Sequence, residues 1–234
     1  MNVPLPNPNL AQLVAAAERL RPLLDQIAFV GGCVTGLLLT DPAAAPVRPT
    51  FDVDAIVEIG SYAEFARLEA RLRDLGFRES HAEGSPICRW LSGDLILDLI
   101  PTDSSILGFS NIWYRPAFEN SQRIQIGENE IRLITAPYFL ATKLEAFHGR
   151  GQADFRLSHD LEDIVTVVDG RVELANEVRA APADLQKYLT KEFGALLSNR
   201  DFLDALPGHL LPDSASQQRI GLVRKRMQQL VVEG

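Results

Sequence analysis

The chain has 234 residues, of which 46% are hydrophobic and 23% are charged, and its net charge at neutral pH is −8. This length supports one large core or two small ones, and the acidic balance argues against broad, sequence-independent nucleic-acid binding, because phosphate contacts need a basic surface. Two cysteines give no disulfide framework, and with neither a signal peptide nor a long apolar stretch in the sequence we expect a cytoplasmic protein without a membrane span.

The first predicted elements are a helix over residues 10–24 and an apolar strand over 26–30, followed directly by Gly31 and Gly32. Glycine after a strand usually marks a tight turn. A short helix over 33–40 comes next. The glycine pair therefore lies at a strand–turn–helix junction.

The next strand opens in the stretch Arg48-Pro49-Thr50-Phe51-Asp52-Val53-Asp54. Side chains alternate along an extended chain, so Asp52 and Asp54 face the same way. At a separation of ~4 Å and an effective dielectric constant of ~20, their repulsion is roughly 4 kcal/mol. A metal ion or a basic group between them would remove that cost, although Asp-x-Asp also occurs at ordinary strand ends and turns.

Helix and hairpin signals follow in turn. Ser61 and Glu64 form a capping box at the start of a helix that stops at Gly76. Two hairpins are predicted after it, and their strands span residues 87–91 with 95–100 and 123–126 with 130–134.

A third acid, Asp98, interrupts the apolar strand 95–100. A buried, unpaired carboxylate is costly, so Asp98 needs a partner. An arginine in the core would serve. So would a hard cation, because Asp52, Asp54 and Asp98 are oxygen donors of the kind that bind Mg²⁺ or Mn²⁺, and no cysteine or histidine stands in a ligand spacing.

Everything after residue 135 is predicted to be helical. The first helix, over 137–147, carries Lys143 on an amphipathic segment, and another begins at Asp160 behind a Ser158 cap. Three more helices are expected, over 182–197, 200–206 and 214–232. We therefore predict an α+β protein with a mixed-sheet lobe over residues 1–135 and an α-helical lobe over 136–234.

The order of Gly31-Gly32, Asp52-Val53-Asp54 and Asp98 resembles the polymerase-β-like nucleotidyltransferase superfamily. Within it, Arg48-x-Thr50-x-Asp52-x-Asp54 looks most like the nucleotidyltransferase toxins of abortive-infection and type IV toxin–antitoxin systems, which also carry a helical lysine and an Asp-x-x-Asp helix start, here Lys143 and Asp160 to Asp163. The chain departs from the pattern of this superfamily at three places. The interval between Gly32 and Asp52 is longer than in most members, Cys33 stands where many members have a polar residue that contacts phosphate, and His159 replaces a basic residue that often precedes the first aspartate of the later motif.

The resemblance implies a role for each residue. Asp52 and Asp54 would hold two divalent ions, and Asp98 would bind the catalytic ion and help to take up the acceptor proton. Backbone N–H groups of Gly31 and Gly32 would approach the phosphates. The remaining nucleotide-binding residues would be Arg48, Thr50, Asp163 and Lys143, of which Lys143 would also be catalytic.

Plainer interpretations stay open in the second half of the chain. Lys143 can be a solvated lysine paired with a nearby acid, and Asp160 and Asp163 can simply complement the helix dipole. His148 and His159 are expected to be ordinary surface residues.

The expected function is a metal-dependent nucleotidyltransferase that moves a nucleoside monophosphate from a nucleoside triphosphate, ATP or another, to an acceptor hydroxyl. The preferred setting is a toxin that modifies tRNA and has an antitoxin protein as partner. The first alternative is an enzyme that modifies a small molecule such as an antibiotic or a metabolite. The alternative from another class is a catalytically silent nucleotide-binding module.

Overall fold

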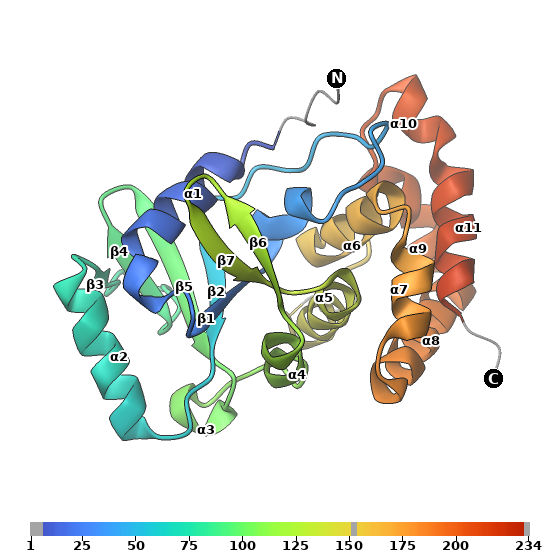
Figure 1. The fold of residues 1–234 in the computed structure, drawn as a ribbon. Coiled ribbons are helices and arrows are strands. Elements are labelled where there is room, and N and C mark those ends of the chain that lie inside the picture. Colours follow the sequence, from blue (N-terminus) through green and yellow to red (C-terminus); the bar gives the residue numbers. More distant parts are fainter. Residues whose placement is uncertain (1–6, 151–153, 232–234) are drawn as a thin grey trace. The chain divides into compact units, whose positions relative to one another are not determined.

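A mixed β-sheet followed by a run of helices makes up the computed structural model, which describes residues 7–150 and 154–231 (Figure 1). The predicted α+β class is confirmed. The first six residues, on which the expectation about a signal peptide rests, lie outside the described residues, as does Val232, the predicted end of the last helix. None of the helices in the described ranges combines the length and the apolar character that a membrane crossing needs.

Two units can be separated by their internal contacts. The sheet unit comprises Pro8–Val34 and Pro49–Thr135, and the helical unit comprises Thr35–Arg48 and the chain from Ala136 onward. The chain thus leaves the sheet unit after the glycine turn, contributes a segment to the helical unit, and returns in time to place Asp52 and Asp54 in the sheet unit.

One seven-stranded mixed sheet is formed by the described strands of the sheet unit, in the order β3-β4-β5-β2-β1-β7-β6. The strands are β1 (Ile27–Val30), β2 (Val53–Val57), β3 (Arg78–Glu79), β4 (Arg89–Ser92), β5 (Leu95–Pro101), β6 (Gln122–Ile126) and β7 (Asn129–Leu133). β2 runs parallel to β5 and β1 parallel to β7, whereas the other neighbours are antiparallel. Both predicted hairpins are confirmed, with Gly93 and Gly127 at positive φ in their turns.

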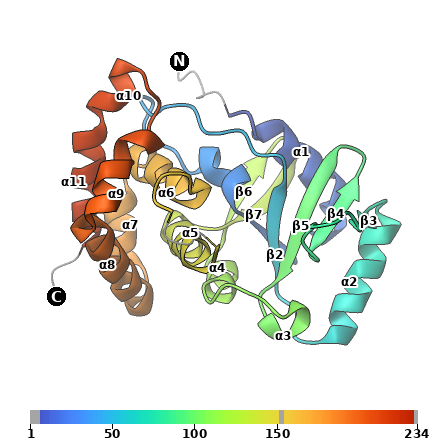
Figure 2. The same ribbon diagram turned by 180° about the vertical axis from the view of Figure 1, so that it is seen from behind.

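Four α-helices flank the sheet within its unit. They are α1 (Leu10–Arg19), α2 (Tyr62–Asp74), α3 (Ser104–Leu107) and α4 (Tyr114–Glu119). α1 crosses the near side of the sheet in Figure 1 and lies behind it in Figure 2. The capping prediction for α2 is confirmed, because the Ser61 hydroxyl accepts a hydrogen bond from the Glu64 amide and Gly76 follows the helix at a φ of 84°.

Two of the predicted helices in this part of the chain are shorter than expected. The helix over 10–24 ends at Arg19 and is followed by a 3₁₀ turn, η1 (Arg21–Leu23). Pro22 lacks the amide that would continue the α-helix, and its ring would clash with the carbonyl four residues earlier. The segment 33–40 forms the 3₁₀ helix η2 (Gly32–Leu37) instead of an α-helix, because its glycines and β-branched residues favour the α-helix poorly.

The helical unit is built from α5 (Ala136–Arg150), α6 (His159–Gly170), α7 (Leu174–Ala180), α8 (Ala183–Ser198), α9 (Arg200–Ala205), η3 (Leu206–His209), α10 (Ser214–Gln218) and α11 (Ile220–Leu230). α5 packs against α6 and α8, and α11 packs against α6 and α8 as well. The core between them is apolar and includes Phe139, Leu144, Ile164, Val168, Leu189, Phe193, Val223 and Met227. The single helix predicted over 214–232 is interrupted at Arg219, which separates α10 from α11.

Arg219 also fixes residues 41–46 between Gly32 and Asp52, the segment that the superfamily resemblance predicts to be an insertion. Its guanidinium donates to Asp169 at 2.8 Å and to Asp41, in the insertion, at 2.8 Å. The backbone amides of Thr40 and Asp41 both donate to the Gly170 carbonyl at 2.8 Å. The insertion is therefore fastened to the end of α6 by one arginine and one carbonyl oxygen.

Replacing Arg219 by methionine should lower the free energy of unfolding by about 3 kcal/mol, because two largely buried carboxylates lose their common partner. Arg200→Met is the matched control, since the Arg200 side chain is 93% exposed and contacts Asp204 only at 3.9 Å. Urea denaturation of both variants measures the difference. Equal midpoints would show that the Arg219 contacts contribute nothing to stability.

Candidate functional site

The glycine turn lies directly against one of the predicted acids. Gly31 follows β1 at a φ of 72°, and β1 pairs with β2 so that Val30 is opposite Asp54. A Cβ atom at Gly31 would overlap the Asp54 carboxylate. Glycine is therefore required here twice, by the backbone conformation and by the space that the Asp54 side chain takes.

Asp52 lies one residue before β2, not within it as the sequence predicted. The segment that leads to it is held by Thr50, whose amide donates to the side chain of buried Asn9 at 2.9 Å and whose hydroxyl donates to the Asp52 carbonyl at 3.3 Å. These two hydrogen bonds fix the backbone on which the Asp52 carboxylate stands. Thr50 thus has a structural role in the sheet unit, and Asn9 is a supporting residue that the sequence analysis did not single out.

Asp98 meets an arginine that the sequence analysis missed. On β5, Asp98 is paired with Asp54 of β2 on one side and with Arg89 of β4 on the other. The Arg89 guanidinium donates from Nε to Asp98 Oδ1 at 2.8 Å and from Nη2 to Asp98 Oδ2 at 2.7 Å. The same Nη2 atom donates to Asp52 Oδ2 at 2.7 Å. One guanidinium is therefore the shared partner of two of the three predicted acids and balances one of their two negative charges.

The pKa of Arg89 is raised above its ordinary value, chiefly by its hydrogen bonds to Asp98, so the guanidinium stays charged. Asp98 is nearly enclosed, with 9% of its side chain exposed, whereas 23% of the Arg89 side chain reaches solvent. The acidic group is thus covered from the β4 side by a cation that itself remains partly hydrated.

This arrangement does not fit a divalent ion as it stands. Within residues 7–150 and 154–231, no three aspartate, glutamate, histidine or cysteine side chains gather as ligands. The Arg89 nitrogen lies between Asp52 and Asp98, where a cation shared by the two carboxylates would have to bind. The alternative in which Asp98 pairs with an arginine describes the structure, and the metal-ligand set Asp52, Asp54 and Asp98 stays a prediction.

Both cysteines are buried and unlinked. Cys33 donates its thiol hydrogen to the Val30 carbonyl at 3.2 Å. Cys88 precedes Arg89, and burial, followed by the nearby Asp98 charge, raises the pKa of its thiol to about 12. A thiol of that pKa is protonated at neutral pH and is a poor nucleophile or metal ligand.

The other predicted residues gather in the helical unit. Lys143 of α5 contacts Asp160 Oδ1 at 3.1 Å, on the first turn of α6, and Asp163 Oδ2 at 2.7 Å, on the next turn. Arg48 contacts Asp163 at 3.3 Å and Glu162 at 3.4 Å. Only 10% of the Lys143 side chain is exposed, so it is a buried, paired lysine and not a solvated one.

The start of α6 also follows the capping prediction, since the Ser158 hydroxyl accepts from the Leu161 amide. Asp160 is therefore placed both to complement the helix dipole and to bind Lys143. His148 and His159 are exposed, as expected, and pair with Glu192 at 2.7 Å and Glu162 at 3.1 Å respectively.

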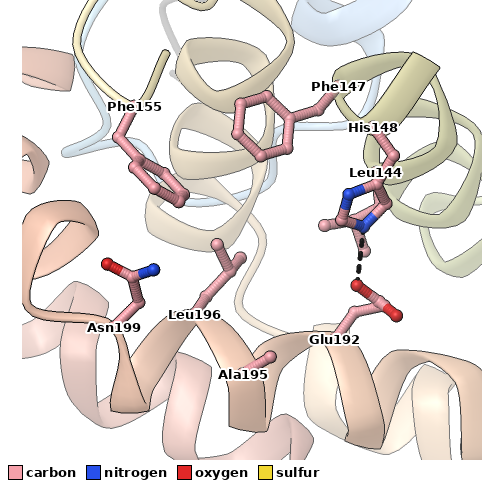
Figure 3. Close-up of a pocket in the computed structure, with 8 residues that line it drawn as sticks. All are labelled: Leu144, Phe147, His148, Phe155, Glu192, Ala195, Leu196 and Asn199. Carbon is pink, nitrogen blue, oxygen red and sulfur yellow. Dashed lines mark hydrogen bonds and ion pairs between the residues drawn. The ribbon is translucent and has the colours of Figure 1, made fainter. Parts of the chain in front are cut away.

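A cavity of about 300 Å³ lies elsewhere in the helical unit, beside α5 and α8 (Figure 3). It is lined by Leu144, Phe147, His148, Phe155, Glu192, Ala195, Leu196 and Asn199. The rings of Phe147 and Phe155 are 5.5 Å apart, and the His148–Glu192 pair lies at the opposite end from Asn199. Its size is at the lower limit for small-molecule pockets. None of the predicted site residues lines it.

Comparison with known proteins gives little further information. No protein-family model and no curated protein matches the chain in sequence. A crystal structure of an antigenic nucleotidyltransferase-like protein from Paracoccidioides brasiliensis is similar at 20% identity, with a TM-score of 0.49 over 88% of this chain and 95% of that one. A candidate nucleotidyltransferase from H. pylori is similar at 12% identity, with a TM-score of 0.49 over 97% and 96% of the two chains. At this level of similarity, the two structures decide neither the fold nor the activity of this chain.

Replacing Gly31 by alanine should lower the free energy of unfolding by about 2 kcal/mol or more, because a positive φ alone costs about 1 kcal/mol and the new Cβ also displaces Asp54. Gly76→Ala is the matched control: its φ is 84°, yet a Cβ there would meet nothing within 4 Å. Urea denaturation of both variants separates the two costs. A loss no larger for Gly31→Ala than for Gly76→Ala would contradict the close approach to Asp54.

Proposed function

We propose that the chain is a nucleotidyltransferase that transfers a nucleoside monophosphate from a nucleoside triphosphate to an acceptor hydroxyl. The proposal is supported by one observation above all: Gly31, directly after β1, lies against Asp54 of β2, which is paired with Asp98 of β5, and Asp52 is joined to Asp98 through Arg89. Three segments that are distant in sequence thus bring together the residues to which the superfamily resemblance assigns catalysis.

In the proposed reaction, the acceptor oxygen forms a bond to the α-phosphorus while the bond from that phosphorus to the bridging oxygen of the β-phosphate breaks. Pyrophosphate leaves with the electron pair, and the acceptor proton passes to Asp98. Amides of the glycine turn are proposed to face the phosphates, whose negative charge they favour. Mg²⁺ or Mn²⁺, if held by Asp52, Asp54 and Asp98, would supply charge neutralisation in the transition state.

The helical unit has its own place in the proposal. Lys143, Arg48 and Asp163 form one ionic group in which Lys143 and Asp163 are buried and Arg48 is partly exposed, and both cations of that group are suited to bind phosphate oxygens. We propose that they bind the triphosphate by exchanging their carboxylate partners for it. For the biological setting, a toxin that modifies tRNA in the cytoplasm and is controlled by an antitoxin protein, the support is the resemblance of the sequence Arg48-x-Thr50-x-Asp52-x-Asp54 to such toxins.

Two other functions have a specific observation in their favour. The net charge of −8 suits a small acceptor better than a nucleic acid, which supports an enzyme that modifies antibiotics or metabolites. The Arg89 contacts with Asp98 and Asp52 support the silent nucleotide-binding module, because an arginine already occupies carboxylate oxygens that a metal ion would need.

Incubating the protein with each labelled nucleoside triphosphate, Mg²⁺ and either tRNA or a pool of small molecules tests the proposal. We expect label on tRNA, and we expect Asp54→Asn to reduce its rate by about a hundredfold or more, because the transferred phosphoryl group loses charge stabilisation. Asp94→Asn, which removes an exposed carboxylate from the β4–β5 turn, is the matched control and should be fully active.

Each of the other results has a definite meaning. Label on small molecules alone would support the first alternative, and no label on any acceptor would support the silent module. Full activity of a folded Asp54→Asn variant would contradict the proposed site.

Lys143→Met should weaken triphosphate binding about tenfold, since one charged partner of the phosphates is lost. It should also lower the free energy of unfolding by about 3 kcal/mol, because Asp160 and Asp163 stay buried with less positive charge. Calorimetric titration with the triphosphate at a temperature where both proteins are folded measures the first effect. Lys187→Met, which removes an exposed lysine from α8, is the control. An unchanged dissociation constant for Lys143→Met would leave this lysine a purely structural role.

A further inference from the structure

The guanidinium of Arg89 holds the position among the acids that a catalytic cation would need. We infer that Arg89 is an internal counter-cation that competes with a divalent ion for Asp98 and Asp52 and thereby weakens the metal affinity of this acidic group. The inference deepens the proposed function, because it concerns the same site, but its test does not require transferase activity.

The contact is built into the sheet. Arg89 and Asp98 are directly opposite each other in the antiparallel pair β4–β5. The backbone on both sides of Arg89 is fixed, since the Cys88 carbonyl accepts from Leu99 at 2.9 Å and the Arg89 carbonyl accepts from Ser80 at 3.0 Å. The backbone therefore delivers the side chain to Asp98, and only the side chain is left to move when another cation arrives.

Arg89 contacts Asp98 and Asp52, two of the three acids to which the proposal assigns metal binding. Both oxygens of Asp98 and Oδ2 of Asp52 accept from Arg89. Asp98 is the acid assigned to the catalytic ion alone, and Asp52 is assigned to both ions. Arg89 thus opposes binding of the catalytic ion more directly than it opposes binding at Asp54.

The charge of the acidic group and the exposure of Arg89 indicate that a divalent ion can displace the Arg89 guanidinium from Asp52 and Asp98. Three carboxylates and one guanidinium leave the group with two negative charges, which still attract a divalent ion. The Arg89 side chain is 23% exposed, so part of it already lies at the surface, next to the water into which it would move. Arginine heads withdraw to solvent in this way while their stems stay packed. An ion that enters can therefore take over Asp52 and Asp98 as the guanidinium leaves.

The experiment is a titration of the whole protein with Mn²⁺, followed by the loss of the free-ion electron paramagnetic resonance signal, without nucleotide. We expect Arg89→Gln to bind Mn²⁺ at least about tenfold more tightly than the unaltered protein, because the competing charge is gone. Arg89→Lys should give an intermediate affinity, since lysine keeps the charge but loses the two-pronged contact with Asp98.

Arg123→Gln is the matched control. Arg123 also belongs to the sheet unit and pairs with two acids, Asp25 at 2.8 Å and Glu130 at 2.6 Å, but these acids are exposed and lie outside the predicted site. The Arg123→Gln variant loses the same positive charge as Arg89→Gln and should bind Mn²⁺ with an affinity within about twofold of that of the unaltered protein. Circular dichroism and thermal unfolding establish that each variant is folded, and Arg89→Lys carries the comparison should Arg89→Gln not fold.

An unchanged or lower Mn²⁺ affinity in the folded Arg89 variants would overturn the inference, and so would the absence of measurable binding in every variant. These results differ from those that would refute the proposed function. Tighter Mn²⁺ binding without any nucleotidyl transfer would uphold the counter-cation and refute the transferase. Nucleotidyl transfer by a protein whose Mn²⁺ affinity does not change when Arg89 is replaced would refute the counter-cation and uphold the transferase.

Discussion

The repulsion among three carboxylates in one region of the sheet is the constraint on which the site depends. β2 and β5 run side by side and place Asp54 beside Asp98, and the segment before β2 adds Asp52. Burying carboxylates close together is costly without a cation beside them, and here that cation is the Arg89 guanidinium. The Asp54 carboxylate also constrains the glycine turn, because only a glycine at position 31 leaves room for it. The acids therefore determine what their neighbours on β1 and β4 must be.

The helical unit solves a similar problem in the same way. Lys143 and Arg48 share Asp163, and each has a second acid, Asp160 or Glu162. In both groups each cation thus already has carboxylate partners, although the acids outnumber the cations. On the proposed function, binding of a metal ion or a triphosphate is an exchange of ion pairs and not the filling of an empty site. Such an exchange lowers affinity, because every new contact replaces an existing one.

Much of this could be predicted from local sequence signals, and the rest could not because it depends on distant partners. The hairpins follow from Gly93 and Gly127, and α2 follows from its Ser61 cap and Gly76 stop. Even Arg89 could have been found: counting back from the two-residue Gly93-Asp94 turn puts Ser92 opposite Leu95 and hence Arg89 opposite Asp98. Its contact with Asp52, the docking of the insertion through Arg219, and the break that Arg219 makes between α10 and α11 require the tertiary fold. The metal-ligand set and the nucleotide-binding residues remain predictions.

The enzyme and the silent module differ in one physical quantity, the free energy with which the acids exchange Arg89 for a divalent ion. A guanidinium carries one charge and two directed hydrogen bonds, whereas Mg²⁺ carries two charges and prefers oxygen ligands. Release of Arg89 is easier when the arginine finds a new acceptor. Phosphate oxygens match its fork as well as a carboxylate does, so a nucleotide that arrives with its ion offers both partners of the exchange at once. On this argument, the ion and the triphosphate bind more favourably together than either does alone, and the ion pair at Arg89 and Asp98 makes the site respond to the substrate complex more than to the free ion.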